Sequence, residues 1–344
     1  MASKGTILIT GLNGYLAGRA AETALKAGYN VRGTVRNVAA GNKVRNALAE
    51  LGYQGGVEVV HVPDMTVAGA FDEAAFGCSA ILHLAALMSE IWTADPQEVV
   101  RMAVDGVTSI LDSAAKAGSQ LQSVVLMSSA AAIFDVPAKT GVYSEKDWNT
   151  TSESAVQNLG REAGGLHAYC ASKSAAERAF WKFREQRKPK FSMATIQATY
   201  IIGPPLVPWE TREQIPLAIS NIWKLLQGED IPGPMLIYES SVDIRDVSRV
   251  LLWASLNPKA ADGERYLCSS ATGGSQAIAD ILNKHMPSLG ITRGSPGQGY
   301  EHDFRSANDT VAFDSRKTVE ATRQNWIPYE RSILDTAQFL RRYL

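Results

Sequence analysis

Several features that mark other classes of protein are scarce or missing in this sequence of 344 residues. The formal net charge is only −1, which argues against nucleic acid or an anionic membrane as the main partner. The three cysteines, Cys78, Cys170 and Cys268, are widely spaced and form no Cys-x-x-Cys pair. Neither a disulfide framework nor a zinc site is therefore expected. No apolar run approaches the roughly 20 residues that a membrane span requires.

The N-terminal end and the composition narrow the choice further. The first ten residues run directly into a predicted strand and leave no room for a signal peptide. No repeat or low-complexity segment is visible, and with 45% hydrophobic residues the chain has material for a large core. We expect a cytoplasmic globular protein without a bound metal, larger than one average domain. Nothing marks an interface, and we expect a monomer or a weak homodimer.

A glycine-rich turn stands between a strand and a helix at the start of the chain. Thr6–Thr10 is a short apolar run typical of a buried parallel strand. Gly11 and Gly14 follow at once, and small apolar residues then recur at helical spacing. Gly11 can adopt a backbone conformation that a Cβ disfavours, and Gly14 lets the main chain approach a ligand. Because this geometry directs backbone N–H groups at a pyrophosphate, we predict a dinucleotide site in preference to a plain turn.

The second predicted strand, Val31–Val35, is followed by cations and by no acid. No Asp or Glu occurs between Thr23 and Ala49, whereas Arg36 stands at the strand end and Lys43 follows it. An NAD site places a carboxylate here for the ribose 2′-OH, and an NADP site replaces it with cations. We therefore predict NADP(H), with Arg36 on the 2′-phosphate and Lys43 as a helper. The alternative is that these cations are simply solvated.

The third and fourth predicted strands also carry candidates at their carboxyl ends, where ligands of open α/β sheets gather. Asp64 and Met65 follow the third strand. Asp64 either faces an adenine amino group or forms a turn. Ala85 follows the fourth strand and is small enough for the sheet edge to lie against a cofactor. His83, within that strand, is expected to be a packed, hydrogen-bonded histidine and not a catalyst.

A tyrosine and a lysine lie one turn apart on a predicted helix that opens at Tyr169 and runs to about Gln186. Tyr169 and Lys173 are four residues apart and therefore share a helix face. A phenol has a pKa of about 10, and a lysine ammonium together with an oxidised nicotinamide favours the phenolate. In the reducing direction Tyr169 would donate its proton to a carbonyl oxygen as hydride reaches the carbon. Lys173 would also bind the nicotinamide ribose.

A serine pair follows the fifth predicted strand, Ser123–Met127. Because successive strand residues point to opposite faces, only one of Ser128 and Ser129 faces the cleft. We prefer Ser129 as the residue that holds and orients the carbonyl oxygen, and Ser128 stays open as the alternative. The next forty or so residues are rich in glycine, and we expect them to be mostly loop.

The rest of the chain is expected to form a smaller second lobe. After the predicted strand Met193–Tyr200, proline becomes more frequent and large apolar residues appear. We predict an α/β protein in which residues 1–198 form a doubly wound parallel sheet of the Rossmann type. Part of 240–270 returns to that sheet, and 199–344 mainly form the substrate-binding lobe.

With these residues collected, the sequence resembles the extended short-chain dehydrogenases/reductases. Among them it looks most like the NADPH-dependent carbonyl and aldehyde reductases of fungi, near the dihydroflavonol reductase branch. The matching segments are spread over about the first two-thirds of the chain: Thr10–Ala17, Val31–Arg36, Asp64-Met65, Ser128-Ser129, Lys146–Asn149, Tyr169–Lys173 with Ala179–Phe183, and Gly203-Pro204.

The resemblance implies a catalytic set of Ser129, Tyr169 and Lys173, because the family's serine is generally the last of its run. It also implies that NADPH is held along the strand ends by Thr10, Gly11, Asn13, Gly14, Tyr15, Leu16, Arg36, Lys43, Asp64, Met65, Ala85, Tyr169 and Lys173.

The substrate pocket is expected between the serine loop and the second lobe. Arg212 and Arg245 are the only arginines between Arg187 and Arg249, too few for the diphosphate of a sugar nucleotide. Together with the aromatic and apolar candidates for the pocket, this favours a hydrophobic or aromatic carbonyl compound over a sugar nucleotide. The candidate lining residues, each of which is equally well explained as core, are Met88, Trp92, Ile133, Phe134, Tyr200, Trp209 and Trp223.

The sequence thus predicts an NADPH-dependent reductase of a hydrophobic or aromatic ketone or aldehyde, with no nucleic-acid or membrane partner. One alternative is a nucleotide-sugar or steroid epimerase/dehydrogenase with tightly held NAD, which Arg36 without a nearby acid argues against. The other is a redox sensor that binds NADP without turnover. Such sensors typically lose the tyrosine and lysine that this chain keeps.

Overall fold

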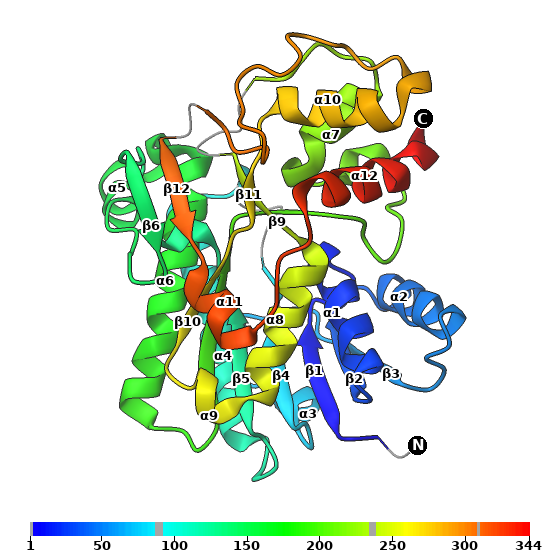
Figure 1. Cartoon of the computed structure of the whole chain (residues 1–344). Coiled ribbons are helices and arrows are strands. Elements are labelled where there is room, and N and C mark those ends of the chain that lie inside the picture. Colours follow the sequence, from blue (N-terminus) through cyan, green and yellow to red (C-terminus); the bar gives the residue numbers. More distant parts are fainter. Residues whose placement is uncertain (1–2, 87–91, 234–238, 308–309) are drawn as a thin grey trace. The chain divides into compact units, whose positions relative to one another are not determined.

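The computed structural model describes residues 3–86, 92–233, 239–307 and 310–344. The chain forms two compact units, each assembled from segments that are distant in the sequence (Figure 1). The first unit contains Met1–Val136, Glu145–Gln197 and Ser248–Tyr266, and the second contains Pro137–Ser144, Ala198–Val247 and Leu267–Leu344.

A seven-stranded sheet is the framework of the first unit. Its strand order is β10-β7-β5-β4-β1-β2-β3. Each pair of neighbouring strands from β7 to β3 in this order is parallel. The order reverses between β1 and β4, which is the doubly wound arrangement that the sequence predicted. The strands are β1 (Thr6–Thr10), β2 (Asn30–Val35), β3 (Val57–His61), β4 (Ala80–His83), β5 (Ser123–Met127), β7 (Ser192–Ala198) and β10 (Arg265–Cys268).

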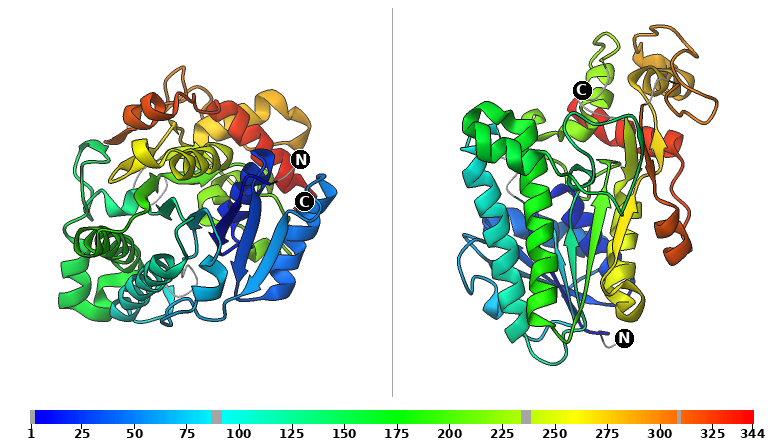
Figure 2. Two further views of the ribbon diagram at one scale, coloured as in Figure 1. Left: turned by 90° about the horizontal axis from the view of Figure 1, so that it is seen from below. Right: turned by 90° about the vertical axis from the view of Figure 1, so that its left-hand side faces the viewer.

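Helices cover both faces of this sheet (Figure 2). On one face α4 (Pro96–Lys116) and α6 (Gly164–Arg187) pack together. Leu8, Ile81 and Val124 of the sheet form a buried core there with Ile110 and Phe180 of the two helices. The remaining helices with residues in this unit are α1 (Tyr15–Lys26), α2 (Val38–Glu50), α3 (Asp72–Ala75), α5 (Ser152–Leu159), α8 (Ile244–Leu256) and α9 (Pro258–Ala261).

The segment between β5 and α6 differs from the sequence expectation. We predicted mostly loop, whereas the structure contains α5 and two 3₁₀ turns, Ala130–Ala132 and Gly160–Ala163, and α6 begins at Gly164 instead of Tyr169. Gly160 and Gly164 have positive φ angles of 53° and 75°. These glycines therefore separate successive helical segments and do not mark an extended loop.

The second unit consists of two small sheets and a group of helices. One sheet has the order β11-β9-β8, and in the other β6 (Gly141–Ser144) pairs in parallel with β12 (Val311–Asp314). The helix expected over Thr336–Leu344 begins earlier and ends in a 3₁₀ turn, Arg341–Tyr343. The other elements are β8 (Tyr200–Ile202), β9 (Ser240–Asp243), β11 (Ala271–Thr272), α7 (Ser220–Leu226), α10 (Ser275–His285), α11 (Arg316–Thr322) and α12 (Tyr329–Leu340).

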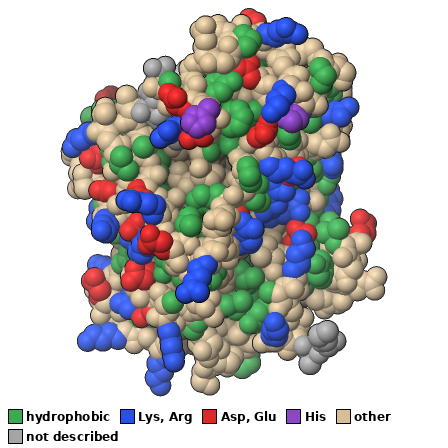
Figure 3. All heavy atoms as spheres, viewed as in Figure 1, with side chains coloured by type: hydrophobic (Ala, Val, Ile, Leu, Met, Phe, Trp, Pro, Cys, Tyr) green, Lys and Arg blue, Asp and Glu red, His purple; other side chains and the backbone are tan. Residues whose placement is uncertain are grey.

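The described helices, the cysteines and one face of the surface bear on the expectations from composition. Among the described helices, none is sufficiently long and apolar to cross a membrane. Cys78, Cys170 and Cys268 are buried free thiols. On the face shown in Figure 3, cationic and anionic side chains both occur, in keeping with a net charge of −1. In the described ranges, no group of three or more His, Cys, Asp or Glu side chains is placed to hold a metal ion.

Candidate active site

The glycine turn after β1 forms one wall of the candidate site. Gly11 has a φ of 68°, and a Cβ placed on it would lie 3.1 Å from the Cα of Ala85. A side chain is therefore disfavoured there both by the backbone conformation and by space. Gly14 donates its N–H to the Gly11 carbonyl at 2.8 Å and is the N-cap of α1. The turn thus leads directly into a helix N-terminus, an arrangement that suits an anionic ligand.

A cavity of about 710 Å³ opens at the carboxyl ends of β1, β2 and β3. This volume lies in the range of small-molecule sites. Nine residues predicted to hold the cofactor line it: Gly11, Asn13, Gly14, Tyr15, Leu16, Arg36, Asp64, Met65 and Ala85. The sequence did not assign the other lining residues to the cofactor: Ala17, Thr34, Val35, Asn37, Val62, Pro63, Thr66, Phe71, Leu84, Ala86 and Met102.

The cations near the end of β2 have different placements. Arg36 is exposed and lines the cavity, whereas Lys43 is exposed on α2 and is not among the lining residues. Arg32 is a structural group, because its Nε donates to Glu58 Oε2 at 2.6 Å and its Nη1 to the Ala74 carbonyl at 3.0 Å. Arg36, rather than Lys43 or Arg32, is therefore placed for an anion in the cavity.

Two short polar side chains hold the backbone at this edge of the cavity. Asn37 caps α2 by accepting the N–H groups of Ala39 and Ala40 at 2.9 and 3.2 Å. Asp64 accepts the hydroxyl and the N–H of Thr66 at 2.7 and 2.8 Å, and these bonds lower the pKa of Asp64. Asp64 thus forms the turn that the sequence allowed and also lines the cavity. Asn37 was missed, although Asn before a helix is a recognisable capping signal.

Thr10, although predicted to hold the cofactor, is not among the residues that line the cavity. It holds the ends of two strands together. Its Oγ1 accepts the N–H groups of Leu84 and Ala85 at 2.9 and 3.0 Å. Because these bonds use both lone pairs, the Thr10 hydroxyl donates to His83 Nδ1, 3.0 Å away. Burial lowers the pKa of His83 to about 3, and the charge of Lys173 adds to this effect. His83 is therefore a neutral, packed histidine with its proton on Nε2, as the sequence analysis expected of a structural residue.

The predicted catalytic residues lie together at the end of β5 and on α6. Tyr169 Oη donates to Ser129 Oγ at 3.2 Å. Ser129 Oγ also accepts the Ala131 N–H at 3.1 Å, which fixes the serine at the start of the 3₁₀ turn. Lys173 Nζ lies 6.0 Å from the centroid of the Tyr169 ring. The structure therefore brings Ser129, Tyr169 and Lys173 into one group.

Ser128 is directed elsewhere. Its hydroxyl donates to Oε2 of Glu177 at 2.5 Å, and both residues are buried. This agrees with the alternation of side chains along a strand, which allows only one of two successive serines to face Tyr169.

The environment of Tyr169 favours the neutral phenol. Burial raises the pKa of Tyr169, and its hydrogen bond with Ser129 opposes that rise. Burial lowers the pKa of Lys173 to about 8, and the negative charge of Glu177 opposes that fall. The lowering of the pKa of Tyr169 that we expect from Lys173 together with an oxidised nicotinamide stays a prediction. A tyrosine that stays protonated is suited to donate a proton and not to remove one.

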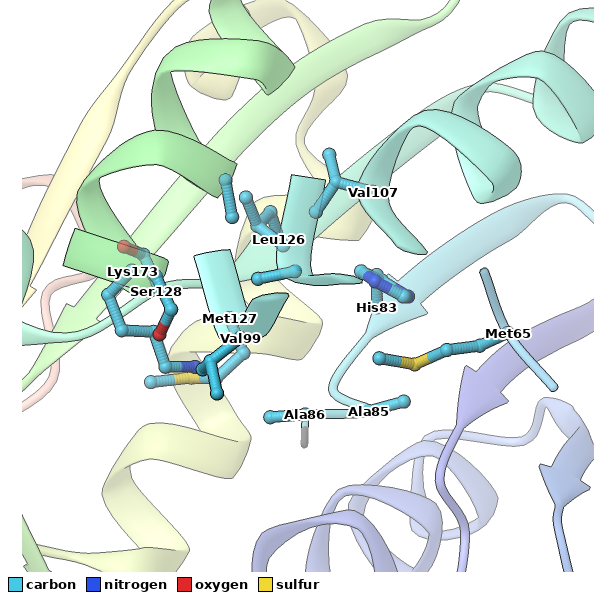
Figure 4. A pocket seen from close by; sticks show the side chains of 13 residues that line it. Met65, His83, Ala85, Ala86, Val99, Val107, Leu126, Met127, Ser128 and Lys173 are labelled. Carbon is cyan, nitrogen blue, oxygen red and sulfur yellow. The ribbon is translucent and has the colours of Figure 1, made fainter. Parts of the chain in front are cut away.

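A second cavity, of about 40 Å³, lies beside Lys173 (Figure 4). Met65, Ala85 and Ala86 line both this cavity and the larger one. The two cavities therefore share these three residues as part of their walls.

The residues predicted for a substrate pocket have varied placements in the first unit. Met88 lies outside the described residues. Ile133 and Phe134 are buried in the core. Trp92 is 60% exposed, and a Cβ on Gly165 would lie 2.1 Å from its Cε3 atom. Trp92 thus lies against the first turn of α6 with much of its ring open to solvent.

In the second unit the predicted pocket residues pack mainly with other aromatic side chains. Tyr200 is half-buried and lines a cavity of about 30 Å³. Trp209 meets Phe339 and Tyr343 with ring centroids 5.7 and 6.4 Å apart. Trp223 is 9% exposed and lies 6.4 Å from the Tyr343 ring centroid. Trp223 in particular is therefore part of the core of this unit.

Comparisons with known proteins agree with this geometry. Residues 7–269 match the NAD dependent epimerase/dehydratase family. The chain is 33% identical over 286 residues to an uncharacterized oxidoreductase of Schizosaccharomyces pombe, with 82% of each chain covered. It is 30% identical over 344 residues to aldehyde reductase 2 of Sporidiobolus salmonicolor, covering 96% of this chain and 94% of that protein. The solved structure of yeast methylglyoxal/isovaleraldehyde reductase Gre2 complexed with NADPH matches with a TM-score of 0.84 at 26% identity over 98% of each chain.

Proposed function

Because the chain belongs to the NAD dependent epimerase/dehydratase family, among the extended short-chain dehydrogenases/reductases, we propose that it reduces a hydrophobic aldehyde or ketone to the alcohol and that Tyr169 supplies the proton. Its relatives include an aldehyde reductase, and one of the solved structures that match is that of a reductase bound to NADPH. The chain is accordingly an NADPH-dependent carbonyl reductase.

The hydrogen bond from Tyr169 to Ser129 is the single observation that carries the proposal. It places a phenolic proton and a second hydroxyl 3.2 Å apart at the carboxyl end of a parallel strand, where ligands of such sheets bind. A carbonyl oxygen between them would receive two hydrogen bonds that strengthen as negative charge develops on it.

The larger cavity fits a dinucleotide. Gly11 stands where a Cβ would meet the backbone of Ala85, and the N-terminus of α1 suits the pyrophosphate. Arg36 at the far edge would bind the 2′-phosphate, and Lys173 would bind the nicotinamide ribose. When bound, NADPH supplies the hydride that is added to the carbonyl carbon.

The protein's own residues handle the proton and the orientation of the substrate. Tyr169 Oη transfers its proton to the carbonyl oxygen while hydride bonds to the carbon, so the product is a neutral alcohol and a tyrosinate that solvent reprotonates. Ser129 holds the oxygen in line. Lys173, still mostly charged at neutral pH with a pKa of about 8, stabilises the tyrosinate by its positive charge.

A hydrophobic substrate is supported by the composition of the second lobe. Arg212 and Arg245 are the only arginines in a long stretch there, and Arg245 is engaged by Asp243 and Asp335, each at 2.7 Å. The stretch between Arg187 and Arg249 therefore offers little to bind a diphosphate. The exposed ring of Trp92 supplies an apolar surface next to the helix that carries Tyr169.

The test is NADPH oxidation by the purified protein with aromatic ketones, ketoesters and aldehydes. Methylglyoxal and isovaleraldehyde represent small substrates in the panel. We expect turnover with NADPH, a large loss with NADH and near-abolition by Tyr169→Phe. Preference for methylglyoxal would overturn the hydrophobic substrate, and turnover of a nucleotide sugar with NAD would favour the epimerase alternative. Tight NADPH binding without turnover on the whole panel would favour a redox sensor.

A further inference from the structure

Glu177 is a fully buried carboxylate that the proposed reaction does not use. It lies on α6 four residues after Lys173, one turn along the same helix face, and its exposed fraction is 0%. Burial of an acidic side chain is costly unless the group is paired and hydrogen-bonded. The partners of Glu177 therefore show what its burial maintains.

Three short hydrogen bonds from two strands converge on Oε1 of Glu177. Arg265 Nε in β10 donates at 2.7 Å. In β7, Gln197 Nε2 donates at 2.7 Å and Thr195 Oγ1 at 2.8 Å. These bonds fasten α6 to the edge of the sheet at the level of the catalytic residues.

The second carboxylate oxygen of Glu177 binds the residue that directly follows β5. Oε2 accepts the hydroxyl of Ser128, and Ser128 directly precedes Ser129. Ser129 is extended, with a φ of −156° and a ψ of 155°. Because the intervening peptide unit is planar, fixing Ser128 restrains the position of the Ser129 hydroxyl. Glu177 thus links the strand that carries Ser129 to the helix that carries Tyr169.

Arg265 extends this support to the segment that precedes α5. Its Nη1 donates to the Asp147 carbonyl at 2.7 Å, and its guanidinium carbon lies 3.8 Å from the centroid of the Trp148 ring. The next residue, Asn149, donates its Nδ2 to the Phe134 carbonyl at 2.6 Å. The segment that follows Ser129, up to Phe134, is therefore connected to the same buried cluster through residues 147–149.

Among the described residues, the charged and titratable groups that act on Glu177 and Lys173 lie on α6, β10 and β4. Glu177 faces Arg265 from β10 and Lys173 on its own helix. Lys173 is in turn faced by Glu177 and Tyr169 on α6 and by the neutral His83 from β4. The charge of Glu177 is thus the negative charge that acts on Lys173 within the described part of this site.

We propose that Glu177 is a positioning residue of the reduction: it fixes Ser129 against Tyr169 through Ser128 and supports the positive charge of Lys173. This inference rests on the roles proposed above for Ser129, Tyr169 and Lys173. Glu177 itself touches neither the reacting atoms nor the cofactor.

The substitution Glu177→Gln tests both proposed roles of Glu177, the positioning of Ser129 and the support of the Lys173 charge, while it keeps the shape of the side chain. Arg265, Gln197 and Thr195 all donate, so the amide oxygen takes the place of Oε1 and the amide nitrogen faces Ser128. The hydrogen bond to Ser128 is then reversed, and the negative charge beside Lys173 is lost.

The experiment measures kcat and KM for NADPH and for an aldehyde or ketone that the wild type reduces, across pH. For Glu177→Gln we expect kcat to fall about tenfold, the loss that corresponds to one hydrogen bond in the transition state, with KM for NADPH unchanged. We also expect the basic limb of kcat/KM to move to lower pH by roughly one pH unit, because Lys173 loses its supporting charge. Ser128→Ala is expected to lower kcat severalfold and leave the basic limb in place.

Three comparisons make the result decisive. Glu185→Gln changes the same residue type at an exposed position of α6 and is expected to behave as wild type. A Glu177→Gln protein that only melts earlier, with kcat and pH profile unchanged, overturns the proposal, as does a Ser128→Ala protein of full activity if Glu177→Gln does not fold. If Tyr169→Phe is as active as wild type in the same assay, the proposed function fails and not this inference alone.

Discussion

The two ends of the candidate site, the adenosine end near Arg36 and the reaction end at Tyr169, differ in how far their side chains are exposed to solvent. At the adenosine end, the side chains of Arg36, Asn37 and Asp64 are exposed, and the polar groups there cap a helix or close a turn. At the reaction end, Tyr169 and Lys173 are half-buried and Ser129 is buried, and a side-chain hydrogen bond joins Tyr169 to Ser129.

This difference follows from what each end must do. A phosphate can be recognised in water by an exposed cation, at a modest gain that salt screens. Proton transfer requires donor and acceptor at fixed positions, and low hydration strengthens each electrostatic interaction. We therefore expect changes at the reaction end to abolish turnover and changes at the adenosine end to shift affinity.

Removal of the Tyr169 hydroxyl is the largest expected effect. Tyr169→Phe keeps the ring in place but leaves the carbonyl oxygen without its proton donor, so kcat should fall by roughly 10²–10⁴. Steady-state NADPH oxidation measures the loss, and NADPH titration should show nearly unchanged affinity. Tyr53→Phe, on the chain after α2, is the matched control. A Tyr169→Phe enzyme with more than a tenth of wild-type kcat would contradict the assigned role.

Arg36→Ala should break the other end without affecting the chemistry. Loss of a charged hydrogen bond to the 2′-phosphate should raise KM for NADPH by roughly tenfold, while kcat and KM for NADH stay the same. The salt dependence of KM for NADPH should also weaken, because the cation of Arg36 is exposed. As a control, Arg45→Ala removes an exposed cation on α2 and should change neither kcat nor KM. Equal losses with NADPH and NADH would exclude a role in phosphate recognition.

The sequence predicted the residues of the reaction end better than the buried residues that hold them in place. The four strands of the sheet whose bounds we predicted agree with the observed bounds within two residues, and Ser123–Met127 matches β5 in full. This accuracy follows because buried parallel strands are continuous apolar runs. Motif spacing then placed Ser129, Tyr169 and Lys173, which the structure brings together, while their roles stay predictions.

The parts that the sequence did not reveal depend on contacts between distant segments. Glu177 lies in the run Ser-Ala-Ala-Glu-Arg of a helix, where an acid usually faces water. Its burial is set by Arg265, which is 88 residues away in the chain. Met102 reaches the larger cavity from α4 and has no local signal. Sequence spacing therefore finds the groups that react, and only the fold shows what holds them.

The pH dependence should separate the two ends without any mutation. Burial lowers the pKa of Lys173 in the folded protein to about 8, below its ordinary value of 10.5. The value of kcat/KM for the carbonyl substrate should therefore fall severalfold within about one pH unit above pH 8. The contribution of Lys173 to folding stability changes with pH in the opposite direction to kcat/KM. Between these two pKa values the unfolded chain binds more protons at Lys173, and this group's contribution to stability rises with pH. NADPH affinity at the Arg36 end should change less. A flat kcat/KM up to about pH 10 would contradict the assignment.

The cap of α2 gives the smallest and most local effect. Asn37→Ala removes a side chain that accepts two N–H groups, so the free energy of unfolding should fall by about 1 kcal/mol. Urea unfolding measures this loss. Asn37→Asp preserves the cap but sets a carboxylate beside Arg36, so stability should hold while KM rises for NADPH and falls for NADH. If Asn37→Asp weakened both cofactors equally, the 2′-phosphate would bind elsewhere, and the adenosine end would owe its selectivity to something other than the exposed charge of Arg36.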